Sequence, residues 1–230
     1  MATGILLSCE HGGNEVPPFY TSLFEGQKKV LDSHRGWDPG TLALGNWLSG
    51  QLSVPLFFSK ITRLLIEINR SLDHDQLFSE FSNLLPHEEK EKLISHYYLP
   101  YRNAVHAGVR EHIPNGKSCL HLSLHSFTPV WKGVERDTDI GLLFDPGRER
   151  EASICCDLLQ FLKGALPELC IQFNRPYLGT DDGLTTFMRT HFSDAMYAGV
   201  EIEINQKWVG TPVFDIISKA FLAAITHLQK

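Results

Sequence analysis

The sequence has few cysteines, and they form no metal-binding or disulfide pattern. The five cysteines are Cys9, Cys119, Cys155, Cys156 and Cys170. An odd number without Cys-X-X-Cys spacing argues against a disulfide framework and against a zinc site built from four cysteines. Most of these thiols are therefore expected to be reduced and buried.

The sequence also lacks an excess of positive charge and a long apolar run. The formal net charge is -6, so the basic surface that binds a nucleic acid duplex is missing, and no nucleic acid partner is expected. No run of about 18 apolar residues is present, and the first residues resemble a strand rather than a secretory signal. We expect a soluble cytoplasmic protein without a membrane partner, acting as a monomer or a small homo-oligomer.

The apolar segments that are present alternate between strand-like and helix-like patterns. Strands are predicted at 4–9, 54–59, 63–68, 117–125, 139–144, 169–173 and 197–204. Helices are predicted at 37–52, at 86–113 with a kink or division at Pro100, at 148–166 and at 211–229. This alternation predicts an α/β protein with a largely parallel, helix-covered sheet, and 230 residues suit a single domain, 1–230. The polar segment 174–196 is predicted to be an irregular functional loop.

Side chains that can bind metals or anions follow several of the predicted strands. Glu10, His11, Asn14 and Glu15 follow the first strand, and further candidates are Asn69, Arg70, His125, Arg175, Asp181, Asp182, Arg189, His191, Glu201 and Glu203. Ligands gather beyond the carboxyl ends of strands in open α/β sheets, so these residues are expected at one edge. Imidazole and carboxylate groups suit zinc, another carboxylate can accept a proton from water, and an arginine can bind a substrate carboxylate. These are the parts of an amide hydrolase acting on a small acidic molecule.

An ordered set of motifs makes the prediction more specific. The set is CEHGGN (9–14), HRGWDPG (34–40), SKITRLLIEINR (59–70), LSLHSFTP (122–129), DIGLLFDP (139–146), NRPYLGTDDGLTTFMRT (174–190) and GVEIEINQ (199–206). It resembles the N-formylglutamate amidohydrolase family over nearly the whole chain. That family is related to zinc carboxypeptidases and aspartoacylases. The resemblance implies a zinc-carboxypeptidase-like (phosphorylase/hydrolase-like) fold, with a mixed, mostly parallel sheet flanked by helices. It also implies a zinc-dependent hydrolase that cleaves the amide bond of a small N-formyl or N-acyl amino acid, such as N-formylglutamate.

The resemblance also implies roles for individual residues. His11 and His125 fall where the family places metal-binding histidines, and Glu203 falls where a carboxylate acts as general base on the water. Asn69 and Arg70 correspond to the pair that binds the substrate's carboxylate, and Arg70 is also assigned to catalysis. Arg189 and His191 are further candidates for substrate contacts.

The third metal ligand is predicted from two alternatives, Asp38 and Glu15. In aspartoacylases a glutamate lies three positions after the first histidine, whereas this sequence has Asn14 there and Glu15 one residue later. An aspartate at the position of Asp38 belongs to the family pattern. We therefore predict His11, Asp38 and His125 as the metal ligands.

Each of these residues also has a purely structural interpretation. His11 could bond a backbone carbonyl in a tight turn, and His125 could be a hydrogen-bonded core residue. Glu203 and Glu201 could form the solvated side of an edge strand. Arg70 could pair with a neighbouring carboxylate at the surface.

Two other functions remain open at the level of sequence. One is a thiol hydrolase that uses Cys9 with His11, which would require an exposed and activated thiolate. The other is a non-catalytic binding module that holds a small acidic ligand through Arg70 and a metal.

Overall fold

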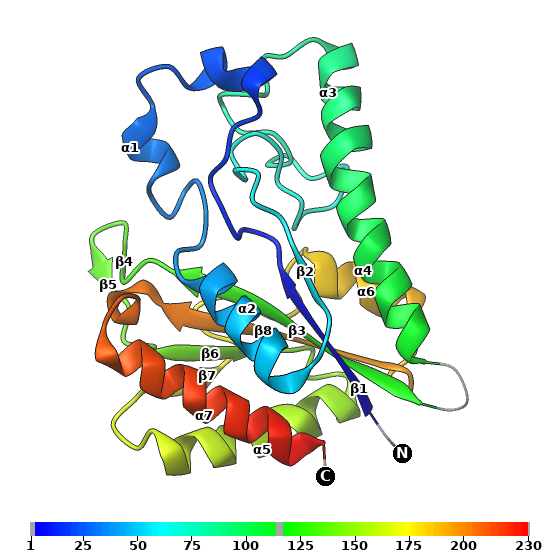
Figure 1. Cartoon of the computed structure of the whole chain (residues 1–230), viewed down its shortest axis with the longest axis vertical. Helices are drawn as coiled ribbons and strands as arrows, with labels where there is room; N and C mark the ends of the chain where they lie inside the picture. Colours follow the sequence, from blue (N-terminus) through cyan, green and yellow to red (C-terminus); the bar gives the residue numbers. More distant parts are fainter. Residues whose placement is uncertain (1–2, 114–116, 230) are drawn as a thin grey trace.

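The computed structural model describes residues 3–113 and 117–229, and its centre is a six-stranded sheet with the order β2-β1-β3-β8-β6-β7 (Figure 1). The strands are β1 (Thr3–Cys9), β2 (Leu56–Phe58), β3 (Ser118–Phe127), β6 (Ile140–Leu143), β7 (Ile171–Phe173) and β8 (Tyr197–Asn205). Strands β2, β1, β3 and β8 run parallel, while β6 is antiparallel to β8 and parallel to β7. The prediction of a mixed, mostly parallel sheet flanked by helices is confirmed.

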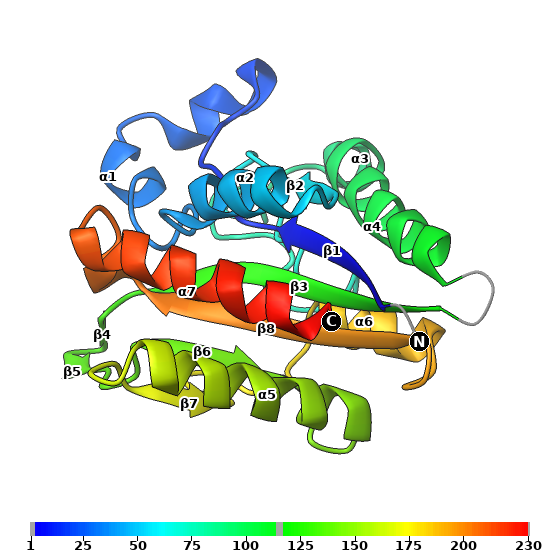
Figure 2. The same ribbon diagram turned by 60° about the horizontal axis from the view of Figure 1, so that its bottom comes forward.

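Helices cover both faces of this sheet (Figure 2). Helices α2 (Thr41–Leu52), α5 (Glu149–Ala165) and α7 (Pro212–Leu228) pack on one face, and α4 (Leu99–His112) and α6 (Leu184–His191) pack on the other. The remaining short helices are Pro18–Phe24, α1 (Lys28–Leu31), α3 (His87–Leu93), Ile94–Tyr98 and Gln206–Trp208. In the described part of the chain, none of the helices has the length and apolar character that a membrane span requires.

The two faces differ because successive side chains of a strand point to opposite sides. The residues facing α2, α5 and α7 are apolar and form the largest core cluster: Ile5, Leu7, Leu120, Leu122, Leu124, Val200, Ile202 and Ile204. The alternate positions carry the polar residues Ser8, Glu10, His121, Ser123, His125, Glu201 and Glu203. The register places Ser123 opposite Glu201 and His125 opposite Glu203, so these polar groups form adjacent rows on one face.

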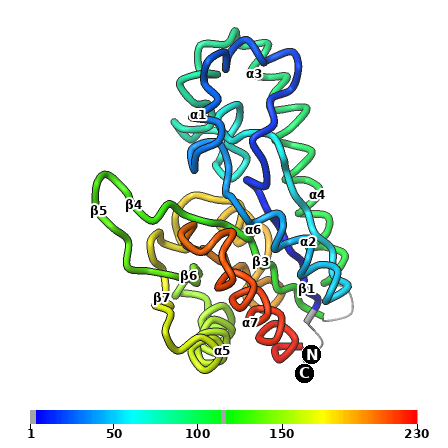
Figure 3. The backbone as a smooth tube through the Cα atoms, turned by 60° about the vertical axis from the view of Figure 1, so that its left-hand side comes forward, coloured from blue at the N-terminus to red at the C-terminus, as the bar shows by residue number. Residues whose placement is uncertain are grey.

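A second, smaller core lies beyond the carboxyl end of β1, in a distal lobe formed by residues 15–36 and 60–98 (Figure 3). The predicted strand at 63–68 belongs to this lobe and is wrong. Residues Leu64, Leu65, Ile66 and Ile68 are buried there, but their backbone forms turns rather than a sheet ladder. Side chains replace the missing strand neighbour, since Ser79 and Ser82 donate hydrogen bonds to the Leu64 carbonyl. The apolar character of residues 64–68 therefore indicates burial in this core and not a strand.

One helix prediction and one loop prediction also need correction. Of the kink or division predicted at Pro100, the division does not occur, because a π-helical segment at Ile94–Tyr98 joins α3 to α4. The wider hydrogen-bond pattern of this segment ends two residues before Pro100, which has no N–H to donate. The segment 174–196, expected to be irregular throughout, contains α6, whose Leu184 and Met188 are buried one helical turn apart.

Candidate metal centre

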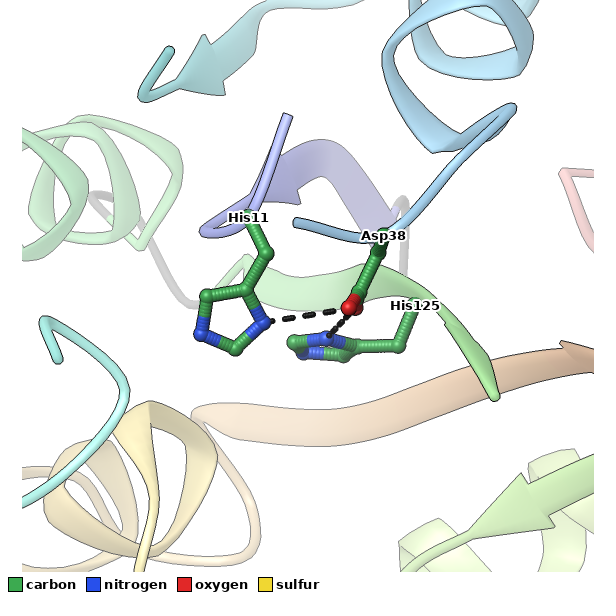
Figure 4. Close-up of side chains that lie close together, drawn as sticks. All are labelled: His11, Asp38 and His125. Atoms are coloured by element: carbon green, nitrogen blue, oxygen red, sulfur yellow. Dashed lines mark hydrogen bonds and ion pairs between the residues drawn. The ribbon is translucent and has the colours of Figure 1, made fainter. Parts of the chain in front are cut away.

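Three buried side chains meet beyond the carboxyl ends of β1 and β3 (Figure 4). His11 follows β1, Asp38 precedes α2, and His125 lies near the end of β3. One ligand atom from each lies within 4.8 Å of the others. Asp38 Oδ2 is 3.3 Å from His11 Nδ1 and 2.9 Å from His125 Nδ1, so both imidazole Nδ1 atoms point towards one carboxylate oxygen.

The alternative third ligand lies elsewhere. Glu15 is exposed, and its carboxylate lies 3.7 Å from Lys60 Nζ. The backbone explains the difference, because the Asp38 N–H donates to the His11 carbonyl at 2.9 Å and so links the two segments directly. The structure therefore brings Asp38, and not Glu15, to the two histidines.

The two glycines after His11 allow this arrangement. A Cβ atom on Gly12 would lie 2.9 Å from the Ser59 carbonyl oxygen, and one on Gly13 would lie 2.7 Å from the Lys60 carbonyl oxygen. Such contacts would force the chain apart at this turn. The Gly-Gly pair thus lets the strand end pack against residues 59–60 while His11 stays in the centre.

Two further carboxylates contact the Nε2 atoms of His11 and His125. His11 Nε2 lies 2.5 Å from Glu67 Oε1, and His125 Nε2 lies 3.1 Å from Glu10 Oε2. Glu10 is itself held by Tyr101 Oη at 2.9 Å and Ser123 Oγ at 2.6 Å. Histidines that bind metals in proteins commonly have this carboxylate contact, which fixes the ring orientation and tautomer. The positioning role of Glu67 was missed because its segment resembled a strand, whereas Glu10 was noted only as a polar residue near His11.

The centre holds an excess of buried negative charge. Burial alone would raise the pKa of Asp38, but His11, His125 and Arg63 hold it well below its usual range. Contacts with histidine likewise keep the pKa of Glu10 low despite its burial, and Arg63 and His11 do so for Glu67. Two of these carboxylates share one arginine, Arg63, which pairs with Glu67 at 2.5 Å and Asp38 at 3.5 Å. A divalent cation between the two Nδ1 atoms and Asp38 fits this donor set and would offset the excess.

Glu203 is a fourth carboxylate beside the same residues. It is buried on β8, opposite His125 in the register, which excludes the solvated edge-strand interpretation. Within residues 3–113 and 117–229, its Oε2 atom is buried and has no hydrogen-bond partner. Burial, together with the charges of Asp38 and Glu201 and against that of His125, raises the pKa of Glu203 to about 8. Buried polar atoms are rarely left without a partner, so this oxygen is available to a molecule that enters the centre.

Asn69 and Arg70 lie two and three residues after Glu67, where the distal lobe meets α6. Asn69 is buried, and its Oδ1 accepts a 2.7 Å hydrogen bond from the Leu184 N–H. Arg70 Nη1 donates to the carbonyls of Asn69 at 3.1 Å and Asp182 at 2.5 Å. The alternative interpretation of Arg70, a surface ion pair with a neighbouring carboxylate, finds no such pair among the described residues.

Arg189 and His191 are not brought to the centre. Arg189 forms an ion pair with Glu151 at 3.0 Å and donates a hydrogen bond to the Gly199 carbonyl at 2.9 Å. Gly199 lies four residues before Glu203 on β8, which corresponds to roughly 13 Å along the strand. His191 is exposed and packs on Phe187. Arg189 and His191 were expected at the same sheet edge as His11 and His125. They lie elsewhere because β6 and β7 are antiparallel to β8, so the chain leaves β7 at the opposite edge.

Cys9 is unsuited to act as a nucleophile. Its thiol is buried and donates to Thr41 Oγ1 at 3.1 Å. Burial raises the pKa of the Cys9 thiol to about 12, whereas an active thiolate needs a lowered pKa and exposure. The thiol-hydrolase alternative therefore has no support in this geometry.

Sequence comparison identifies the family. A family model described as N-formylglutamate amidohydrolase matches residues 3–209. The chain belongs to the N-formylglutamate amidohydrolase family. Members of this family are hydrolases that act on amides, and His11, Asp38, His125 and Glu203 all lie inside the matched range.

Solved structures agree with this assignment at the level of the fold. A gene product of Agrobacterium tumefaciens is 27% identical with a TM-score of 0.81, covering 100% of this chain and 93% of its own. An N-formylglutamate amidohydrolase from Ralstonia eutropha JMP134 is 16% identical with a TM-score of 0.73, covering 99% of this chain and 93% of its own. No curated protein matches the sequence.

Proposed function

We propose that this member of the N-formylglutamate amidohydrolase family is a zinc-dependent hydrolase that cleaves the amide bond of a small N-formyl or N-acyl amino acid, such as N-formylglutamate. The observation that carries the proposal is the buried cluster of His11, Asp38 and His125 beside a carboxylate oxygen of Glu203 that lacks a partner. A centre built only for stability would not leave that oxygen unsatisfied.

The metal would be held by His11, Asp38 and His125. Two imidazole nitrogens and one carboxylate oxygen are a donor set typical of catalytic zinc, with room left for water or substrate. When bound, the metal supplies a positive charge that polarises the substrate carbonyl and lowers the pKa of a water molecule. Glu67 and Glu10 keep the two imidazole rings in place through their Nε2 atoms.

Glu203 is the proposed general base. Its unpartnered oxygen accepts a proton from the attacking water as the new C–O bond forms at the substrate carbonyl. The same carboxyl group then returns the proton to the amide nitrogen as the C–N bond breaks. The products are the free amino acid and the acid of the acyl group, so each proton is accounted for.

Asn69 and Arg70 are the proposed binding groups for a substrate carboxylate. Arg70 Nη1 is held by two carbonyls, which fixes the plane of the guanidinium group. The rest of the fork can then make two parallel hydrogen bonds to a carboxylate.

The first test is metal content together with turnover. Wild type and His11→Ala would be purified without histidine tags or chelators and analysed for zinc, then assayed on a panel of N-formyl and N-acyl amino acids. Stoichiometric zinc in wild type, lost in the variant together with hydrolysis, is the expected result. Full activity of metal-free protein would contradict the proposal, and ligand binding without any turnover would favour a non-catalytic binding module for a small acidic ligand.

A further inference from the structure

A cluster of aromatic side chains surrounds one arginine beside the metal centre. The hairpin formed by β4 (Val130–Trp131) and β5 (Val134–Glu135) projects from the body next to the end of β3 (Figure 3). Arg136 follows β5, and its guanidinium carbon lies 5.4 Å from the ring centre of Phe127, 5.3 Å from Trp131 and 5.0 Å from Tyr177. These four residues are called the Arg136 cluster below.

The Arg136 cluster adjoins the metal centre through two segments. Phe127 lies two residues after His125 on the same strand, so both side chains are on the polar face. Tyr177 belongs to the segment after β7, which crosses β6 at Gly141. A Cβ atom on Gly141 would lie 2.0 Å from the Arg175 carbonyl oxygen and 3.2 Å from Glu203 Cβ. The missing side chain at Gly141 therefore lets this segment approach Glu203.

Tyr177 and His34, on two sides of the Arg136 cluster, have charged neighbours from both the cluster and the metal centre. Burial and the charge of Glu203 raise the pKa of Tyr177, and the charges of Arg136 and Arg63 oppose that rise. On the other side, the ring of His34 lies 6.0 Å from that of Trp131. The pKa of His34 is lowered by burial and by Arg35, Arg63 and Arg136, and raised by Asp38. The charge of Arg136 thus affects the pKa of two residues that the charges of Glu203 or Asp38 also affect.

The described residues accept hydrogen bonds from only part of the Arg136 guanidinium group. Its Nη1 donates to Tyr177 Oη at 3.1 Å and more weakly to the Thr128 carbonyl at 3.4 Å. Across the described ranges, 3–113 and 117–229, none of the ion pairs involves Arg136. By contrast Arg63, the arginine in contact with Asp38, already pairs with two carboxylates. Aromatic rings contact the faces of a guanidinium group and leave the N–H groups at its edge available to a carboxylate.

We propose that Arg136 binds a carboxylate of the substrate and so acts as a specificity-determining residue, separate from Asn69 and Arg70. This inference rests on the hydrolase function proposed above. The rings of Trp131 and Tyr177, which are 45% and 39% exposed, form the walls beside that carboxylate. The hairpin then serves to hold a charged, planar group at the mouth of the centre.

The test compares substrates that differ by one carboxylate. Zinc-loaded wild type, Arg136→Gln and Arg136→Lys would be assayed on N-formylglutamate and on its two monoamides, in which either the α-carboxylate or the side-chain carboxylate is replaced. In Arg136→Gln we expect KM for N-formylglutamate to rise about 10- to 100-fold, as for loss of a charged hydrogen bond. The monoamide that lacks the carboxylate bound by Arg136 should show little change. Arg136→Lys should recover part of the loss, because it keeps the charge but not the fork.

Arg110→Gln is the matched control, because Arg110 is exposed in the last turn of α4, outside the site. This variant should leave KM unchanged for N-formylglutamate and for both monoamides. An equal loss on all three substrates would assign Arg136 a structural role and overturn the inference, as would no change on any of them. Melting temperatures show whether a loss comes from misfolding.

Calorimetric titration with N-formylglutamate separates this inference from the proposed function. Binding by zinc-loaded wild type that is lost in Arg136→Gln would support the inference even if no hydrolysis occurred. Equal binding by both proteins, or no binding by wild type, would overturn it.

Discussion

The two faces of the central sheet are buried to a similar degree, but one forms the main hydrophobic core and the other carries the candidate metal centre. Leu122, Leu124 and Ile202 on one face pack against α2, α5 and α7 and contribute hydrophobic stabilisation. On the other face His125, one residue after Leu124 on β3, and Glu10, directly after β1, are similarly buried but hydrogen-bonded. Burying such groups costs free energy that their partners only partly recover. The comparison shows that one strand can stabilise the fold with half of its side chains and position the chemistry with the other half.

The polar face itself changes along the strands. At the beginning of β1, β3 and β8 it carries Leu6, Cys119 and Tyr197, which pack under α4 and α6. Towards the carboxyl ends it carries His125 and Glu203. The candidate metal ligands and Glu203 therefore lie towards the carboxyl edge, while the apolar residues near the beginning of this face pack as core under α4 and α6.

The largest expected effect comes from changing the polar face at Glu203. Glu203→Gln should lower kcat by about 10²- to 10⁴-fold, because the amide cannot accept the proton from water. The free energy of unfolding should not fall, since the variant removes an ionisable group with an unpartnered buried oxygen. Steady-state assays and urea unfolding measure the two quantities, and zinc content should match wild type. Activity within a few-fold of wild type would remove Glu203 from the mechanism.

The apolar face should respond in the opposite way. Leu122→Ala removes a fully buried side chain and should lower the free energy of unfolding by about 2–5 kcal/mol. At a temperature well below the melting point, kcat and zinc content should stay close to wild type. Urea unfolding monitored by tryptophan fluorescence provides the stability. A large loss of kcat in well-folded Leu122→Ala would mean that the two faces are not independent.

A smaller effect is expected from a residue that only supports a ligand. Glu10→Gln should weaken zinc binding about 10- to 100-fold, because the contact with His125 Nε2 loses its charge. Competition with a chelator of known affinity measures the change. Glu111→Gln, at the exposed end of α4, is the matched control and should bind zinc like wild type. Unchanged affinity in Glu10→Gln would show that ring orientation does not depend on this carboxylate.

The smallest effect belongs to Cys9, which faces the apolar side near Thr41. Cys9→Ala should keep kcat/KM unchanged and lose only a little stability, because a small buried group is removed. Assays with and without a thiol-modifying reagent provide the measurement. Loss of turnover in a stable Cys9→Ala variant would revive the thiol-hydrolase alternative.

Local patterns were sufficient to predict much of the fold and the residues of the metal cluster. The strands β1, β3 and β8 and the helices α5 and α7 each carry a regular apolar pattern, so burial and geometry agree. His11 and His125 lie at the ends of predicted strands, whereas Asp38 was predicted only through the resemblance of the motif set to the family pattern. The structure brings these three together, with Glu203 buried opposite His125 in the register.

Features that depend on distant contacts could not be predicted. The contact of Glu67 with His11 joins residues 56 positions apart, in a segment whose apolar run serves the distal lobe. The direction of β6 is set by its pairing with β8, which no local pattern records, and that direction keeps Arg189 away from the centre. The Arg136 cluster likewise joins a hairpin to the segment after β7.

The three residues of the metal cluster are far apart in the chain, with 27 positions between His11 and Asp38 and 87 between Asp38 and His125. An unfolded chain rarely brings such distant groups together, so an ion bound by all three would bind the folded state selectively. Folding and ion binding are then linked equilibria, and the melting temperature rises with the logarithm of the free ion concentration. The resistance of this protein to heat would accordingly depend on the metal supply of its surroundings as well as on its sequence.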